Sequence, residues 1–242
     1  MVKRKTISAI LKAGVILMTA SLMSLIGCTQ INDDTSSKIT CLLEEKYGEE
    51  FLVSQIGNRL DTDSVTAYCR AAGNATLPFT VIMTRGGDLD DDYVQRYFGR
   101  QVESVIQEKF RERSIDTASV VTIFAPSGYP VKPDITLEAF IRQYAPGMFI
   151  ADLIIPDTQA PFDENIPFSQ ALNDAYSALS VEIQCKIKTV SPDNFEDCKN
   201  RAAEEPDFNA TIIRRDYGVV KEHTCKVNSD GIEFFENFYD NQ

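Results

Sequence analysis

Apolar and polar residues alternate along several short stretches of the chain, which is the pattern of half-buried β-strands. Phe79, Val81 and Met83, for example, are interleaved with residues that include two threonines. The same alternation, together with a high content of β-branched and aromatic residues, predicts further strands. The expected strands are Phe51–Ile56, Ser64–Arg70, Pro78–Thr84, Ala118–Phe124, Met148–Ile155, Val181–Thr189, Ala210–Arg215 and Val219–Val227.

Apolar residues spaced three and four apart predict helices between these strands. The clearest helix runs from about Asp90 to Arg111, where Val94, Phe98 and Val102 fall on one side and suit a helix lying on a sheet. Gly48 is placed to end a first helix as its C-terminal cap. The other expected helices are Ser37–Tyr47, Thr136–Tyr144, Pro167–Leu179, Pro192–Ala203 and a short aromatic one at Ile232–Tyr239.

The order of these elements predicts an α+β fold. Strands and helices mix without strict βαβ alternation, which favours antiparallel-rich sheets with helices packed on them. The stretch Ala125–Asp134 contains three prolines and a glycine, so it is the best boundary between two small subdomains.

The first residues have the order of an export signal. Lys3, Arg4 and Lys5 precede a run of 15 uncharged residues, Ala13–Gly27, which is shorter than the roughly 20 apolar residues of a membrane-spanning helix. The run ends in Leu25-Ile26-Gly27-Cys28, which resembles the lipobox of bacterial lipoproteins. The resemblance implies cleavage between Gly27 and Cys28 and attachment of diacylglycerol and palmitate-type acyl chains to Cys28.

Two acyl chains on Cys28 would give stable membrane anchoring, since each buried CH₂ contributes roughly 0.8 kcal/mol. The polar stretch that follows reads as a flexible tether. We therefore expect five segments: a signal peptide at 1–27, a tether at 28–37, an α+β subdomain at 38–125, a proline-rich linker at 126–134 and a second α+β subdomain at 135–242. The location expected is the cell membrane, with the protein lipid-anchored on its extracytoplasmic face.

Charge excludes one class of function. The segment 1–27 has four basic residues and no acidic one, so the remaining 215 residues have 20 basic against 36 acidic side chains, a net charge of −16. A body this acidic is repelled by nucleic acid and by anionic lipid headgroups. We expect no nucleic-acid partner.

Five cysteines follow Cys28, and an exported chain meets an oxidising space in which disulfides persist. Alternation and helical spacing point both Cys185 and Cys198 inward, so a Cys185–Cys198 bridge is one pairing to consider, and Cys41–Cys69 is another. The alternative is that they are small buried apolar residues. The absence of a CxxC spacing argues against a redox motif or a zinc site.

Other motifs give no reaction. Asp88, Asp90 and Asp92 have the first spacings of a calcium-binding EF-hand loop, but Tyr93 and Gly99 stand where glycine and glutamate are required. We expect instead that Asp88 or Asp90 caps the following helix and that the other aspartates lie at its positive end. His223 is the single histidine, so a metal site with several histidine ligands is excluded. The sequence also contains no GxSxG motif around a serine that His223 could activate in a catalytic triad. Phosphate-binding glycine loops are missing. We predict no catalytic residues, no metal and no cofactor.

A further resemblance concerns the mature chain. The segment 43–51 (LEEKYGEEF), the strand residues Ala67-Tyr68-Cys69 and the helix start Ile135-Thr136-Leu137-Glu138 together resemble uncharacterised lipoproteins of Gram-positive gut bacteria. The likeness covers much of the mature chain. It favours a Gram-positive envelope, and it assigns no activity to the chain.

These observations favour a non-enzymatic binding or interaction module at the cell envelope, with an envelope protein or a ligand as its unknown partner. Two other hypotheses remain open at this stage. One is an envelope hydrolase that uses carboxylates the sequence does not locate. The other is capture of a small solute for a transporter, which predicts a cleft near the Ala125–Asp134 linker.

Overall fold

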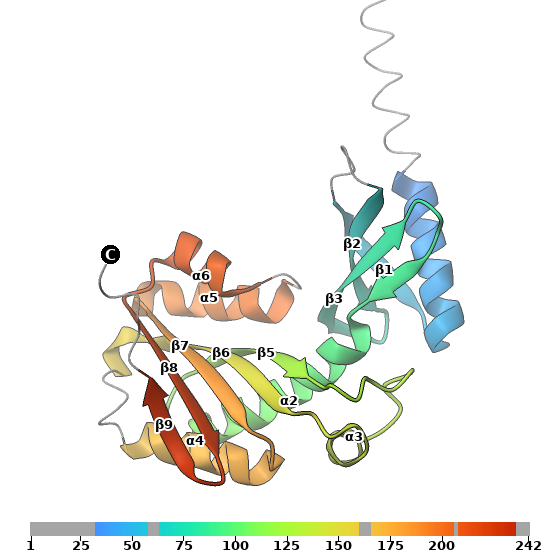
Figure 1. Ribbon diagram of the computed structural model, residues 1–242. Coiled ribbons are helices and arrows are strands. Elements are labelled where there is room, and N and C mark those ends of the chain that lie inside the picture. The colour runs from blue at the N-terminus through green and yellow to red at the C-terminus, as the bar shows by residue number, and fades with distance from the viewer. Residues whose placement is uncertain (1–31, 58–62, 160–165, 206–207, 236–242) are drawn as a thin grey trace, which may run out of the picture.

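The computed structural model describes residues 32–57, 63–159, 166–205 and 208–235. They form two sheets with helices packed on them, so the predicted α+β class is confirmed (Figure 1). The signal segment 1–27 and the lipobox lie outside the described residues.

Sheet A is an antiparallel meander in the order β1-β2-β3-β4. Its strands are β1 (Phe51–Ile56), β2 (Ser64–Ala71), β3 (Asn74–Thr84) and β4 (Leu89–Asp91). The first three coincide closely with the predicted strands. Ile39 and Leu43, one helical turn apart on the N-terminal helix (residues 32–47), share a core with the inward residues of this sheet.

The N-terminal helix ends as predicted and begins earlier than predicted. Gly48 has a φ of 78° and donates its N–H to the carbonyl of Glu44, which is the glycine cap expected there. Residues 32–37 were expected to be part of a flexible tether, but they are helical. The tether was predicted from polar composition alone. The apolar face of the helix begins only at Ile39, so the turns before it carry no apolar periodicity that would have indicated a helix.

Helix α2 (Tyr93–Glu112) joins the two sheets, and its predicted apolar stripe is buried. The helix starts after Asp90, since residues 89–91 pair with β3 as an edge strand. The expected capping by Asp88 or Asp90 is therefore wrong. Asp91 accepts the N–H of Tyr93 instead, at 3.1 Å.

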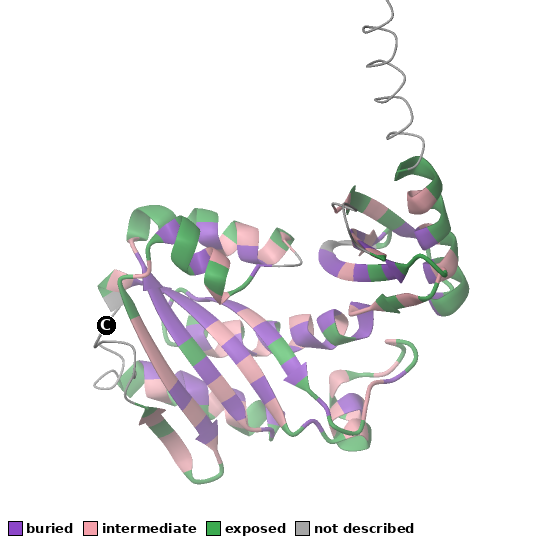
Figure 2. Ribbon diagram, turned by 45° about the horizontal axis from the view of Figure 1, so that its top comes forward, coloured by how far each residue is buried: buried purple, intermediate pink, exposed green. Residues whose placement is uncertain are grey.

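Sheet B has five strands in sequence order, β5 to β9, with one parallel pair, β6 and β7. The crossover of this pair is α4 (Ile166–Leu179), and α3 (Leu137–Tyr144) lies between β5 and β6. The strands are β5 (Ala118–Phe124), β6 (Met148–Pro156), β7 (Ile183–Val190), β8 (Lys221–Asn228) and β9 (Gly231–Phe235). Helices α2 and α4 cover one face of the sheet, and α5 (Pro192–Glu204) and α6 (Ala210–Tyr217) cover the other (Figures 1 and 2).

Two expected elements have the wrong type. Ala210–Arg215 was expected to be a strand, but it belongs to α6, because the side chain of Asn209 caps the helix by accepting from the N–H groups of Thr211 and Ile212. Ile232–Tyr239 was expected to be a helix, but residues 231–235 form β9 in a hairpin with β8. The hairpin turn explains the difference, since Gly231 has a φ of 110°; residues 236–239 lie outside the described part.

The expected boundary at 126–134 does not separate the two sheets. Strand β5 precedes this segment, yet it pairs with β6, which follows it. The change from one sheet to the other takes place across α2, and one continuous core includes residues of both sheets. Tyr129 fastens the 126–134 segment by donating its hydroxyl to the carbonyl of Ile123.

Candidate functional site

A hollow surface lies where the outer face of sheet A meets the end of α5. We call it the intersheet cleft. Its first hollow has a volume of about 360 Å³ between β1–β3 and the end of α5, and its second, of about 290 Å³, lies over α2 and β5. The first is lined by Ser54, Gln55, Tyr68, Cys69, Arg70, Pro78, Glu204 and Glu205. The second is lined by Asp92, Gln95, Arg96, residues 120–123, Phe208 and Asn209.

Strand alternation gives the cleft its sheet A wall. In β2, Val65, Ala67 and Cys69 are buried, so Tyr68 and Arg70 point to the outer face. The strand register places Leu52 of β1 and Pro78 of β3 opposite Arg70 on that same face. Leu52 is 60 % exposed, which leaves an apolar side chain uncovered at the rim of a mainly polar wall.

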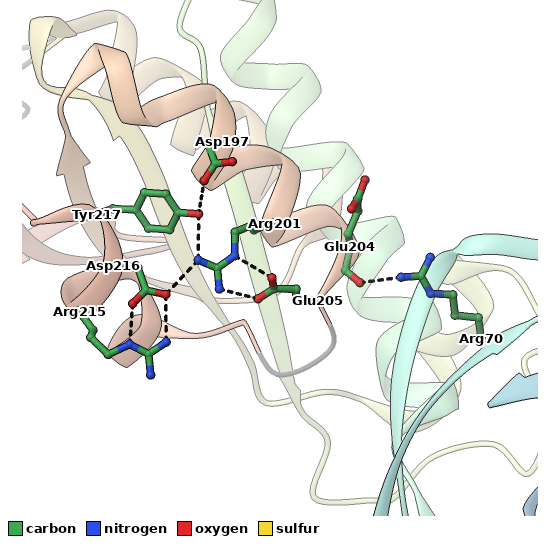
Figure 3. Close-up of polar contacts among 8 residues, drawn as sticks. All are labelled: Arg70, Asp197, Arg201, Glu204, Glu205, Arg215, Asp216 and Tyr217. Carbon is green, nitrogen blue, oxygen red and sulfur yellow. Dashed lines mark hydrogen bonds and ion pairs between the residues drawn. The ribbon is translucent and has the colours of Figure 1, made fainter. Parts of the chain in front are cut away.

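Two arginines, Arg70 on β2 and Arg100 on α2, bind the end of α5. Nη2 of Arg70 donates to the carbonyl of Glu204 at 3.3 Å, and Nη2 of Arg100 donates to the carbonyl of Ala203 at 2.5 Å (Figure 3 shows the Arg70 contact). The last carbonyls of a helix lack helical partners and carry the negative end of its dipole, so guanidinium groups are favourable there. These contacts join residues that are more than a hundred positions apart in the sequence, and they fix the distance between the cleft walls.

Arg201 fastens α5 to α6 behind the cleft (Figure 3). Its guanidinium makes a bidentate pair with Glu205, at 2.7 and 2.9 Å, and also binds Asp216 at 2.9 Å. The hydrogen bonds that its guanidinium donates to Glu205, Asp216 and the hydroxyl oxygen of Tyr217 raise the pKa of Arg201, which keeps it charged throughout the physiological range. Burial, with a hydrogen bond to Asp197, raises the pKa of Tyr217 to about 12.

A buried ion-pair group adjoins the second hollow through Arg96 and Val121, which line it. The carboxylate of Glu103 is almost fully buried, and it lies 2.7 Å from Nη1 of Arg100 and 3.6 Å from Nη1 of Arg96. Its Oε1 also accepts the backbone N–H of Val121 in β5, at 2.9 Å. Buried charges need such compensation, because an unpaired one costs several kcal/mol.

Asp92 lies at the junction of the second hollow and sheet A. Burial raises its pKa, although the hydrogen bond that it accepts from the N–H of Thr80, at 2.6 Å, and the nearby charge of Arg96 oppose the shift. The carboxylate of Glu205 is likewise held by Arg201. These two acidic groups of the cleft are thus held as hydrogen-bond acceptors by their neighbours.

Of the cysteines considered from the sequence, Cys69 lines the first hollow with its side chain buried in the core, whereas Cys185 and Cys198 do not line the cleft. Gly27 and Cys28 are outside the described residues. Cys185 belongs to the core beneath α2 and α4, whereas Cys198 lies in the separate core beneath α5 and α6, on the opposite face of sheet B. The structure does not bring this pair together, because β7 points Cys185 away from α5; both are free thiols.

The remaining candidates are also separated from the cleft or held in the core. Cys41 is exposed, Cys69 is fully buried, and both are free thiols. His223 lies on β8 opposite Ile187. In the described part of the aromatic C-terminal run, Ile232 and Phe234 pack against the core. Within the part of the chain that the structure describes, no group of three or more histidine, cysteine or acidic side chains is arranged to hold a metal ion.

Sequence reasoning missed the cleft residues Arg70, Arg96 and Arg100 and their acidic partners. No local motif marks them, since each is a common residue in an ordinary helix or strand. Their significance arises from contacts between segments far apart in sequence, such as the Arg70–Glu204 contact across 134 positions.

Comparison with known proteins gives a fold and no activity. The sequence matches no protein-family model and no curated protein. The structure is similar to the crystal structure of a DUF5037 family protein from Ruminococcus gnavus, with a TM-score of 0.58 and 18 % sequence identity over 84 % of this chain and 95 % of that chain. The two proteins share a fold, and the bacterial source of that protein agrees with the resemblance to uncharacterised proteins of gut bacteria.

None of the helices in the described ranges combines the length and the apolar character that crossing a bilayer requires.

Proposed function

We propose that the protein is a membrane-anchored extracytoplasmic lipoprotein that serves as a non-enzymatic binding module at the cell envelope. The anchor rests on the sequence Leu25-Ile26-Gly27-Cys28 after a charge-free run. The binding role rests on one structural observation, the intersheet cleft. Its walls are held at a fixed spacing by arginine contacts with the end of α5.

The lining of the cleft suits a polar ligand or a polar segment of an envelope protein. It presents guanidinium, carboxylate and amide groups beside the ring of Tyr68, so both charged and uncharged polar groups would find partners. Preformed walls reduce the ordering cost of association. The strongly acidic body keeps the module clear of the anionic surface to which it is tethered.

Capture of a small solute is the second candidate, favoured by the size of the hollows. Volumes of about 290 and 360 Å³ fall near the lower end of ordinary ligand pockets, roughly 300–1,000 Å³. The second hollow includes residues 120–123 of β5, directly before the 126–134 segment near which such a cleft was expected.

Lipid labelling tests the anchor. Host cells that produce the full chain are given a labelled palmitate, and the protein is recovered from the membrane fraction. We expect label in the wild-type protein and in the matched control Cys41→Ala, and no label in Cys28→Ala. Equal labelling of Cys28→Ala and wild type would refute the lipobox assignment.

Site-specific photo-crosslinking on intact cells tests the cleft. A photoreactive amino acid replaces Gln55, which is exposed and lines the first hollow, or Ser229 at the β8–β9 turn as a matched control. We expect a reproducible adduct only from the Gln55 position. Adducts of equal yield from both positions, or from Ser229 alone, would contradict the assignment of the cleft as the binding surface.

A further inference from the structure

Cys185 and Cys225 lie directly opposite each other on neighbouring strands. The antiparallel register of β7 and β8 pairs the two residues, and both side chains are fully buried on the same face of sheet B. Their thiols are within hydrogen-bonding contact, and this contact, together with burial, raises the pKa of Cys185 well above its usual value. Opposite residues of an antiparallel pair have Cβ atoms about 4.5–5.5 Å apart, near the reach of a disulfide.

The residues that flank this pair along the sheet differ in size. Ala151 on β6 is the register partner of Cys185 on its other side, and Phe234 on β9 is the register partner of Cys225. The small Ala151 side chain places little bulk beside the Cys185 sulfur. The face that bears both cysteines is covered by α4 (Figure 1).

We propose that Cys185 and Cys225 form a cross-strand disulfide in the exported protein. The structure shows the reduced, dithiol form of this pair. The inference rests on the proposed function, because persistent disulfides belong to oxidising compartments outside the cytoplasm. It replaces the Cys185–Cys198 pairing considered from the sequence, and it leaves Cys41, Cys69 and Cys198 as free thiols.

The oxidant is the disulfide of an envelope thiol–disulfide oxidoreductase. One cysteine thiolate attacks that disulfide, forms a mixed disulfide and expels one oxidant thiolate, which takes up the proton. The second cysteine thiolate then attacks its neighbour's sulfur and expels the other oxidant thiolate, which is also protonated. Two thiols lose two electrons, and the oxidant disulfide becomes a dithiol. Because both sulfurs are fully buried in the fold, the reaction precedes completion of the core, after export.

Thiol counting on the full chain tests this proposal. The protein is taken from its host under acid quench, denatured without reductant, alkylated and digested. We expect alkyl groups on Cys41, Cys69 and Cys198 and one linked peptide that joins Cys185 to Cys225. In Cys185→Ala, Cys225 should become alkylated, whereas in the matched control Cys198→Ala the linked peptide should persist.

Reduction provides a second measurement. Because both sulfurs are buried, the protein is reduced in denaturant and refolded with reductant present. Closing a loop of this length is expected to stabilise the protein, so the reduced wild type should have a Tm about 10 °C below that of the oxidised wild type. The Tm of Cys185→Ala should be unaffected by reductant. An unchanged wild-type Tm would count against the disulfide.

The same digest distinguishes the failure of this inference from the failure of the proposed function. A chain cleaved before Cys28 with all five remaining cysteines alkylated would overturn the disulfide and leave the export proposal standing. A linked Cys185–Cys225 peptide in an uncleaved chain would support the pairing and contradict the proposed location. An uncleaved chain with every thiol alkylated would overturn both.

Discussion

The hydroxyl of Tyr47 donates a 2.6 Å hydrogen bond to Oδ1 of Asp91, which joins the end of the N-terminal helix to the strand that leads into α2. The Asp91 side chain is fully shielded from solvent, and it also accepts from Nζ of Lys46 at 2.8 Å. Tyr93, just after it, returns the contact by donating its hydroxyl to Glu49 at 2.6 Å. The Tyr47–Asp91 and Tyr93–Glu49 hydrogen bonds together position sheet A on α2. They thereby also position the cleft wall that sheet A forms.

Removal of the Asp91 carboxylate should therefore weaken the whole fold. We expect Asp91→Ala to lower the free energy of unfolding by about 3 kcal/mol, because it leaves several donors without their acceptor in a buried site. Tyr47→Phe, which removes one hydrogen bond, should cost about 1 kcal/mol. Urea denaturation measures both. The exposed neighbour Asp90 is the control, and an Asp91→Ala loss no greater than that of Asp90→Ala would refute this role.

Glu103 should be the most sensitive charged residue of the buried ion-pair group. Glu103→Ala would leave Arg96 and Arg100 without their buried partner and the N–H of Val121 without an acceptor, so we expect a loss of about 3–5 kcal/mol in the free energy of unfolding. Glu108→Ala, at an exposed position on the same helix, should change the stability by less than about 0.5 kcal/mol. Similar midpoints for the two variants in urea would show that the ion-pair group contributes little.

Helix α2 approaches β5 closely at Gly99. A substitution there is expected to change the stability in the direction opposite to that expected from helix propensity. An alanine normally stabilises a helix interior by about 1 kcal/mol relative to glycine. A Cβ at Gly99, however, would lie 2.9 Å from the carbonyl oxygen of Val121, which is backbone and has no freedom to rotate away. We expect Gly99→Ala to lower the free energy of unfolding by about 1–2 kcal/mol.

Thermal denaturation compares Gly99→Ala with Ser104→Ala, an exposed substitution on the same helix that should have little effect. An increase in the Tm of Gly99→Ala would mean that β5 moves away easily, and that the second hollow of the cleft is less firmly fixed than the contacts with Val121 indicate.

Elements with a strong hydrophobic periodicity of their own could be predicted from the sequence. Strand β5 and helix α2 have strong periodicity, and their positions were close to those observed. Helix α6 was missed, because Thr211, Ile212 and Ile213 resemble a strand unless the capping by Asn209 is given more weight. The cleft could not be predicted, since its walls come from β1, β2 and α5, and their proximity depends on tertiary contacts that no local pattern encodes.

The pH dependence of stability should reveal the buried carboxyl of Asp92. Its pKa is raised chiefly by burial, so the folded protein holds this proton more tightly than the unfolded chain does. As pH rises above about 4, the unfolded chain loses the proton first, and the wild type becomes less stable relative to Asp92→Asn until the folded-state pKa is passed. The amide oxygen of Asn can still accept from the N–H of Thr80, so this variant isolates the charge. Urea denaturation of both proteins across the acidic range measures the difference. A difference that instead grows in favour of the wild type with rising pH would mean that Thr80 and Arg96 together outweigh the burial of the charge.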